Sequence, residues 1–214
     1  MLHLLDYPFD SQTIMKKRRG LKRELLSFGG NFLDKKVAIL GGSTTKDITE
    51  ILELFLLKNN IKPAFYESEF GQYWEDAIFD NPILEEFSPD LFYIHTSNRN
   101  LQHYPSPSSS KKEIDQSLSN EFTRYEKMWD SLRKKYGCLV IQNNFELPFF
   151  RILGNLDSVD FRGRTNYILK LNSMFATYAE NNADLIINDI NYLSASFGLQ
   201  KWSAPQDWYL DKYS

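Results

Sequence analysis

The sequence contains a single cysteine, Cys138, among its 214 residues, and therefore cannot form an internal disulfide. Cys138 begins an apolar run, where a buried and reduced thiol is expected, as in a cytoplasmic protein. No apolar stretch approaches the roughly 20 residues of a membrane span, and the N-terminus lacks the basic-then-apolar pattern of a signal peptide. We therefore expect a cytoplasmic chain with no membrane partner.

The chain also lacks a large net charge of either sign and a recognisable metal-binding pattern. The formal net charge is -3, which gives no electrostatic case for a nucleic-acid partner. The basic cluster at residues 16–19 lacks an aromatic or glycine pattern, so it is expected to coat a solvated helix face. The three histidines have no metal-ligand spacing with cysteines or acids, and no Walker A loop is present. We expect no metal, no cofactor and no nucleic acid.

Apolar residues, by contrast, are plentiful: 42% of the chain is hydrophobic and 15% is aromatic. This composition fits one large globular domain over residues 1–214. Within it, residues 1–30 form a leading helical region, with a helix expected over Phe9–Phe28. The segment YPSPSSS at residues 104–110 is the most loop-like part of the chain and is expected to be mobile.

Short apolar runs alternate with helical patterns along the rest of the chain. The expected strands are Val37–Leu40, Ile61–Tyr66, Leu91–Ile94, Cys138–Gln142 and Leu185–Asp189. The expected helices that separate and follow them are Thr45–Asn59, Gln72–Phe79, Lys111–Tyr136, Arg164–Asn181 and Asn191–Phe197. This alternation predicts an α/β fold, a three-layer α/β/α sandwich with a mostly parallel five-stranded sheet in the order 2-1-3-4-5.

The stretch around residues 37–50, VAILGGSTTKDITE, reads as a buried strand, a tight glycine turn and a helix start. Thr44 is the expected N-cap, with Asp47 at the position of a capping-box acid. Ser43 would then lie beside free backbone N–H groups that favour an anion. Three interpretations are open: an attacking serine with an oxyanion hole, a phosphate or carboxylate cradle, or simply a well-capped helix.

Polar residues follow every predicted strand, and ligands in such folds bind at the carboxyl ends of the strands. We expect Ser43, Asn98 and Asn144 to line one pocket there, with His95 or Arg151 nearby. Other readings of these residues are open. His95 could be a buried core histidine, Asn144 could satisfy loop carbonyls, and Arg151 could pair with Glu146. Asp189 is more simply explained as the cap of the last helix.

Four long segments resemble the N-terminal domain of FkbH-like proteins, which belong to the haloacid-dehalogenase (HAD) superfamily, subfamily IIIC. They are VAILGGSTTKDITEILELFLLKNNIKPAFYESEFGQYWEDAIFDNP, YIHTSNRN, IQNNFELPFFRILGNLD and YLSASFGLQKW…DWYLDKY. The resemblance implies a flavodoxin-like, SGNH-hydrolase-like domain that a HAD domain follows. The nucleophile motif of that second domain, Asp-x-Asp-x-Thr/Val, is not matched by Asp157 and Asp160, so we expect the HAD domain to lie outside this chain.

The resemblance also implies roles for single residues. Ser43 matches the nucleophile of block one, Gly71 lies near the block-two glycine, and Asn98 lies near the block-three asparagine that donates to an oxyanion. The block-five Asp-x-x-His is unmatched, which leaves His95 as the candidate base.

Three functions are open. The first is an esterase or acyl hydrolase with Ser43, Asn98 and His95 as catalytic residues. The second is a non-catalytic accessory domain that binds a small acyl or phosphorylated ligand, free or on an acyl carrier protein, for the HAD domain. The third is a purely structural interaction module. The candidate ligand-binding residues are Gly42, Thr44, Gly71, Asn144, Arg151 and Asn155.

Overall fold

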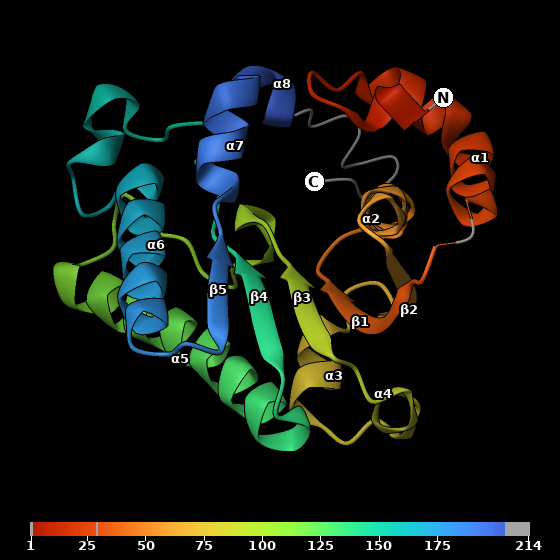
Figure 1. The fold of residues 1–214 in the computed structure, drawn as a ribbon. Helices are drawn as coiled ribbons and strands as arrows, with labels where there is room; N and C mark the ends of the chain where they lie inside the picture. Colours follow the sequence, from red (N-terminus) through yellow and green to blue (C-terminus); the bar gives the residue numbers. More distant parts are fainter. Residues whose placement is uncertain (1, 29, 204–214) are drawn as a thin grey trace.

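A computed structural model describes residues 2–28 and 30–203 of the chain. Five parallel strands form one sheet in the order β2-β1-β3-β4-β5, which confirms the predicted topology. The strands are β1 (Leu33–Gly41), β2 (Ile61–Glu67), β3 (Leu91–His95), β4 (Leu139–Asn143) and β5 (Leu185–Asn188). Because all five run in the same direction, their carboxyl ends share one edge of the sheet (Figure 1).

Helices connect the strands and surround the sheet (Figure 1). They are α1 (Ser11–Ser27), α2 (Lys46–Lys58), α3 (Tyr73–Ile78), α4 (Pro82–Phe87), α5 (Lys111–Tyr136), α6 (Arg164–Glu180), α7 (Ile190–Phe197) and α8 (Leu199–Ser203). Among the described residues there are also three short 3-10 helices, η1 (Leu2–Leu5), η2 (Asn98–Asn100) and η3 (Gly154–Ser158). In the described part of the chain, no helix has the length and apolarity needed to cross a membrane.

The main hydrophobic core lies between one face of the sheet and helices α3, α5 and α6. Phe92 of β3 and Val140 of β4 pair in register and are fully buried there. Trp129 of α5 and Phe175 of α6 pack edge-to-face, with ring centroids 4.8 Å apart. Aromatic side chains bury large areas and favour this geometry, so this core accounts for the high aromatic content.

The opposite face of the sheet is covered unevenly. Helix α2 packs on β2, and α1 packs outside α2 through a second core that includes Leu21 and Leu54. Figure 1 shows α1 and α2 on one side of the molecule and α5 and α6 on the other. Along β3–β5 this face is more open, and Ile186 is 47% exposed. This face of the sheet is therefore less completely covered at β5 than at β1 and β2.

The capping residues explain the clearest helix boundaries. Ser110 and Glu113 form a reciprocal capping box at the start of α5, and Gly137 ends it in the left-handed conformation with φ 63°. The expected range Lys111–Tyr136 is accordingly confirmed. At the first helix the expected start at Phe9 is two residues early, because Asp10 is the N-cap and accepts from the N–H of Thr13.

Two other local features differ from the expectations. Thr45, and not Thr44, is the N-cap residue of α2, and its hydroxyl donates to Glu67 Oε2 at 2.7 Å, away from the helix N–H groups. After the expected helix Gln72–Phe79 the chain forms α4, a helix that the sequence analysis did not predict. Asn81 accepts from two N–H groups of the first turn, and Pro82 occupies a position where a missing N–H is harmless.

Candidate functional site

The carboxyl ends of β1 and β3 are joined directly. The N–H of Gly42 donates to the carbonyl of His95 at 2.8 Å, and Asn100 Nδ2 donates to the carbonyl of Gly42 at 2.9 Å. Ser43 and Asn98 therefore lie at the same edge of the sheet, as expected from their positions after strands. That these two residues act on the same ligand stays a prediction.

The two glycines before Ser43 are required by packing within the protein. A Cβ at Gly42 would lie 2.4 Å from Asn100 Nδ2, and one at Gly41 would lie 2.5 Å from Thr45 Cγ2. The group that approaches this turn most closely is therefore a side chain of the same chain. Ser43 itself is only 4% exposed. The glycine pair does not by itself indicate a ligand.

His95 belongs to a polar network on the sheet face opposite the main core. Its Nδ1 is 2.9 Å from Asn143 Nδ2, while Asn143 Oδ1 accepts from Tyr93 at 3.1 Å and from Asn188 at 2.8 Å. An amide nitrogen facing Nδ1 fits a neutral imidazole that is protonated at Nε2. Burial lowers the pKa of His95 to about 4. The ring is therefore neutral at pH 7 but a weak base.

Asn144 holds the loop that follows β5. Its Nδ2 donates to Asp189 Oδ1 at 2.8 Å and its Oδ1 accepts from the N–H of Asn191 at 2.9 Å. Asp189 in turn accepts from the N–H of Tyr192 as the N-cap of α7. The interpretation of Asp189 as a helix cap is correct, and Asn144 supports that cap.

The remaining sequence candidates are spread around the loops. Thr44 is half-buried beside Ser43. Gly71 is exposed, with φ +77° and open space where a Cβ would lie. Arg151 and Asn155 are exposed on the segment that leads into α6. Binding by these residues stays a prediction.

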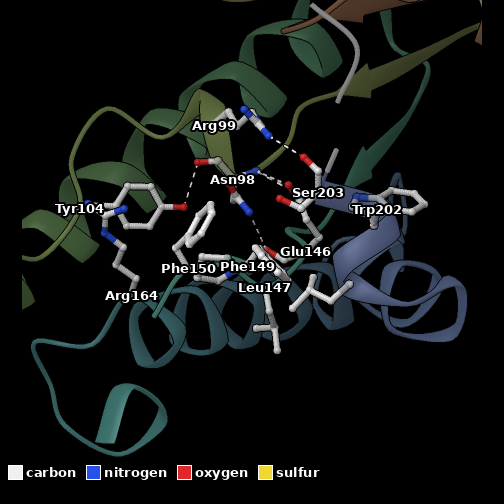
Figure 2. A pocket seen from close by; sticks show the side chains of 12 residues that line it. Asn98, Arg99, Tyr104, Glu146, Leu147, Phe149, Phe150, Arg164, Trp202 and Ser203 are labelled. Atoms are coloured by element: carbon white, nitrogen blue, oxygen red, sulfur yellow. Dashed lines mark hydrogen bonds between the residues drawn. The ribbon is translucent and has the colours of Figure 1, made fainter. Parts of the chain in front are cut away.

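A cavity of about 320 Å³ lies at the same edge of the sheet, and its described lining includes Asn98 but not Ser43 or Asn144 (Figure 2). Asn98 makes two contacts with Glu146, which follows β4. Its N–H donates to the carboxylate at 3.2 and 3.4 Å, and its Nδ2 donates to the Glu146 carbonyl at 3.2 Å. Asn98, expected to donate to an oxyanion near Ser43, therefore directs its amide nitrogen to the loop after β4.

Glu146 is the carboxyl group of the described cavity lining. Burial raises its pKa to about 7, against the opposing effects of hydrogen bonds from its own N–H and that of Asn98 and of the charge of Arg99. The side chain is only 5% exposed although it lines the cavity. A buried carboxyl with a raised pKa in a concave site can hold or release a proton at neutral pH, which makes it a functional candidate.

Two guanidinium groups complete the polar lining. Arg99 Nη2 donates to the carbonyl of Ser203 at 2.9 Å, which joins η2 to the end of α8. Arg164 lies with its guanidinium 5.0 Å from the ring centroid of Tyr104. Figure 2 shows Tyr104 and Arg164 at one end of the cavity, with Trp202 at the other and Phe149 and Phe150 between them.

The main chain around Arg164 fixes its position. Asp157 Oδ2 accepts from the N–H of Thr165 at 2.7 Å, and Asp157 Oδ1 accepts from the N–H of Leu153 at 3.2 Å. Gly163 packs so tightly that an added Cβ would be 2.0 Å from the carbonyl oxygen of Asp157. Arg164 is therefore held at the first position of α6 by a rigid corner.

The sequence analysis named Glu146 only as a possible partner of Arg151, and Arg164 only as the start of a helix, and did not combine them into a site. Two signals were available. Glu146 interrupts an otherwise apolar segment, FELPFF, where a charge is expensive to bury. Arg164 begins a helix, where a positive charge opposes the helix dipole. Their proximity in space depends on loop conformations that no local pattern encodes.

Comparison with solved structures supports the fold. The chain superposes on the N-terminal part of the protein BF1531 from Bacteroides fragilis, described as containing a phosphatase domain complexed with Mg. The TM-score is 0.77 at 16% identity, over 94% of this chain and 51% of that one. The chain shares the fold of the part of that structure that it covers, which is about half of the length of that structure's chain. This agrees with the fold that the resemblance to FkbH-like proteins implied.

Two hydrolase structures also match, at lower similarity. One is an acetyl xylan esterase, AlAXEase, with a TM-score of 0.46 and 13% identity over 84% of this chain and 86% of that one. The other is an acylhydrolase candidate from Bacteroides fragilis, with a TM-score of 0.42 and 15% identity over 84% and 77%. No family model and no curated protein matches the sequence.

The magnesium in the BF1531 structure belongs to that protein. Among residues 2–28 and 30–203 of this chain, no group of three His, Cys, Asp or Glu side chains is placed to hold a metal ion.

Proposed function

We propose that this chain is the SGNH-like domain of an FkbH-like protein and acts as an accessory ligand-binding domain for a HAD-type domain. Its ligand is a small acyl or phosphorylated compound, free or carried on an acyl carrier protein. The fold shared with the N-terminal part of BF1531, which is described as containing a phosphatase domain and is about twice as long as this chain, supports this arrangement.

The environment of His95 is the observation that favours binding over hydrolysis. A serine nucleophile needs a base whose pKa is near the working pH and whose free nitrogen can reach the hydroxyl. His95 has a pKa of about 4, and its Nδ1 faces the amide of Asn143 at 2.9 Å. It is therefore poorly suited to activate Ser43, and the sequence offers no block-five histidine to replace it.

Ester hydrolysis by the purified chain tests this proposal. We expect the turnover of p-nitrophenyl acetate and butyrate to be the same for the wild type, Ser43→Ala and Ser173→Ala, a control at an exposed serine of α6. Small carboxylates and phosphate monoesters should raise the melting temperature of the chain. Turnover that is lost in Ser43→Ala and kept in Ser173→Ala would establish a serine hydrolase and contradict the accessory role.

A further inference from the structure

We propose that the cavity lined by Glu146 and Arg164 binds the oxyanion of a small molecule that carries an apolar chain. The anionic group is a carboxylate or a phosphate monoester. This inference rests on the proposed ligand-binding function and places the site away from the Ser43 turn, where the sequence motif had placed it.

Arg164 supplies the anion-binding group. Its Nε is buried and has no hydrogen-bond partner among the described residues. Its guanidinium is held near the ring of Tyr104, and the Tyr104 hydroxyl donates to the carbonyl of Asn98 at 3.0 Å. A guanidinium presents several N–H donors in a fixed plane that suits carboxylate and phosphate oxygens. Because Arg164 lines the cavity, an anion bound there would lie beside this guanidinium.

The position of Arg164 also favours an anion electrostatically. It is the first residue of α6, so its charge adds to the positive end of the helix dipole. Arg99 brings a second guanidinium to the same cavity. Glu146 is the acidic group of the described lining, and in its protonated form it can donate a hydrogen bond to a ligand oxygen.

The apolar part of the ligand is inferred from the aromatic residues that line the cavity. Phe149 and Phe150 are 39% and 67% exposed, although large apolar side chains are usually buried. Trp202 lines the cavity from α8 (Figure 2). The volume of about 320 Å³ suits a small ligand, at the lower end of the range for ligand pockets. A short alkyl or acyl chain against these rings would reduce their exposure to water.

Titration calorimetry with defined probes tests the proposal. The probes are hexanoate, hexyl phosphate, acetate, inorganic phosphate and the neutral analogue hexanamide. We expect hexanoate or hexyl phosphate to bind, the shorter anions to bind more weakly, and hexanamide to bind at least about tenfold more weakly because it lacks the charge. The comparison of hexanoate with hexyl phosphate identifies which oxyanion the cavity prefers.

Arg164→Gln should weaken binding of the preferred anion by about tenfold or more. Arg162→Gln is the matched control. It removes the same charge two residues away, from a side chain that pairs with Asp160 outside the described cavity lining. Arg164→Lys keeps the positive charge, so it should bind the preferred anion more tightly than Arg164→Gln does. This difference would show that the binding lost in Arg164→Gln is due to the lost charge, even if that variant is less stable.

Phe150→Ala should weaken the binding of hexanoate more than the binding of acetate. Phe79→Ala changes an exposed phenylalanine outside the described cavity lining and should alter the binding of neither ligand. Binding that is unchanged in Arg164→Gln and Arg164→Lys would place the ligand elsewhere and overturn this inference, while leaving the accessory function intact. Absence of binding by every anion probe would overturn the inference. Absence of binding together with Ser43-dependent ester turnover would overturn both proposals.

Discussion

The main-chain N–H of Asn98 donates to the carboxylate of Glu146, at 3.2 Å to Oε1 and 3.4 Å to Oε2. This contact ties the loop after β3 to the loop after β4 and holds an acidic group in a mostly buried position. The pKa of that group, about 7, reflects the loss of hydration. Burial raises the pKa of Glu146 and the hydrogen bond from Asn98 lowers it, and together they influence whether this carboxyl is protonated at neutral pH.

The first prediction concerns the stability of the fold. The pKa of Glu146 is higher in the folded chain than its ordinary value of 4.5, so the protonated form is the one that folding favours. Its contribution is fully present below about pH 4.5 and is lost as the pH rises through about 7. We expect the free energy of unfolding of the wild type to fall by up to about 3 kcal/mol, relative to Glu146→Gln, over this range.

Urea unfolding of the wild type and of Glu146→Gln at several pH values between 4.5 and 8 measures this difference. His95 contributes with the opposite sign, because its pKa is lowered, but it is present in both proteins and cancels in the comparison. Parallel pH curves for the two proteins would show that Glu146 titrates normally.

The second prediction concerns ligand binding and follows from the proposed oxyanion site. A protonated Glu146 no longer repels an anion, so hexanoate should bind about tenfold more tightly at pH 6 than at pH 8. Of the other groups at the cavity, the guanidiniums of Arg99 and Arg164 stay charged, and the pKa of Tyr104 is raised further by burial. Calorimetry should show a flat pH profile for Glu146→Gln, and a steep one would assign the effect to another group.

The third prediction concerns the His95 network. Asn143→Asp would place a carboxylate next to Nδ1, while the donors of Tyr93 and Asn188 would still find an acceptor. An adjacent negative charge favours the imidazolium form, so the pKa of His95 should rise from about 4 by about 1–3. NMR titration of the histidine ring protons measures this change, and an unaltered pKa would show that the two side chains are not in contact.

The fourth prediction concerns the glycine turn before Ser43. Gly42→Ala should destabilise the fold by about 1–3 kcal/mol through overpacking against Asn100. In an Asn100→Ala background the same change should be less destabilising, because the obstructing amide is gone. Gly71→Ala is a useful contrast, since its Cβ would enter open space and only the positive φ is strained. Equal effects of Gly42→Ala in both backgrounds would contradict the packing explanation.

Much of the fold follows from the sequence because its signals are local. The buried strands are short apolar runs, and α5 is marked by a capping serine at one end and Gly137 at the other. The first half of β1 was missed because residues 33–36, LDKK, lack an apolar pattern. They pair with β2 residues 61–64 at the edge of the sheet, where one side can remain exposed. Helix α4 was missed because Asn81-Pro82 can both end one helix and begin the next.

The candidate site was less accessible to sequence reasoning. The strand order brings the loops after β1, β3 and β4 to one edge, so Ser43 and Asn98 were correctly placed there. The sequence could not show that Asn98 turns toward Glu146, or that Asn143 occupies the nitrogen of His95 that faces it. These relationships join residues about 48 positions apart and depend on side-chain orientation rather than on any periodic pattern.

The corner at Gly163 has an evolutionary consequence. Because Gly163 has no Cβ, the Asp157 carbonyl oxygen can lie 2.0 Å from the position that this atom would occupy. Any natural variant that adds a side chain at this position must rebuild the corner and displace Arg164. In relatives that retain the arginine, selection on the cavity should therefore appear as an invariant glycine at a residue that touches no ligand.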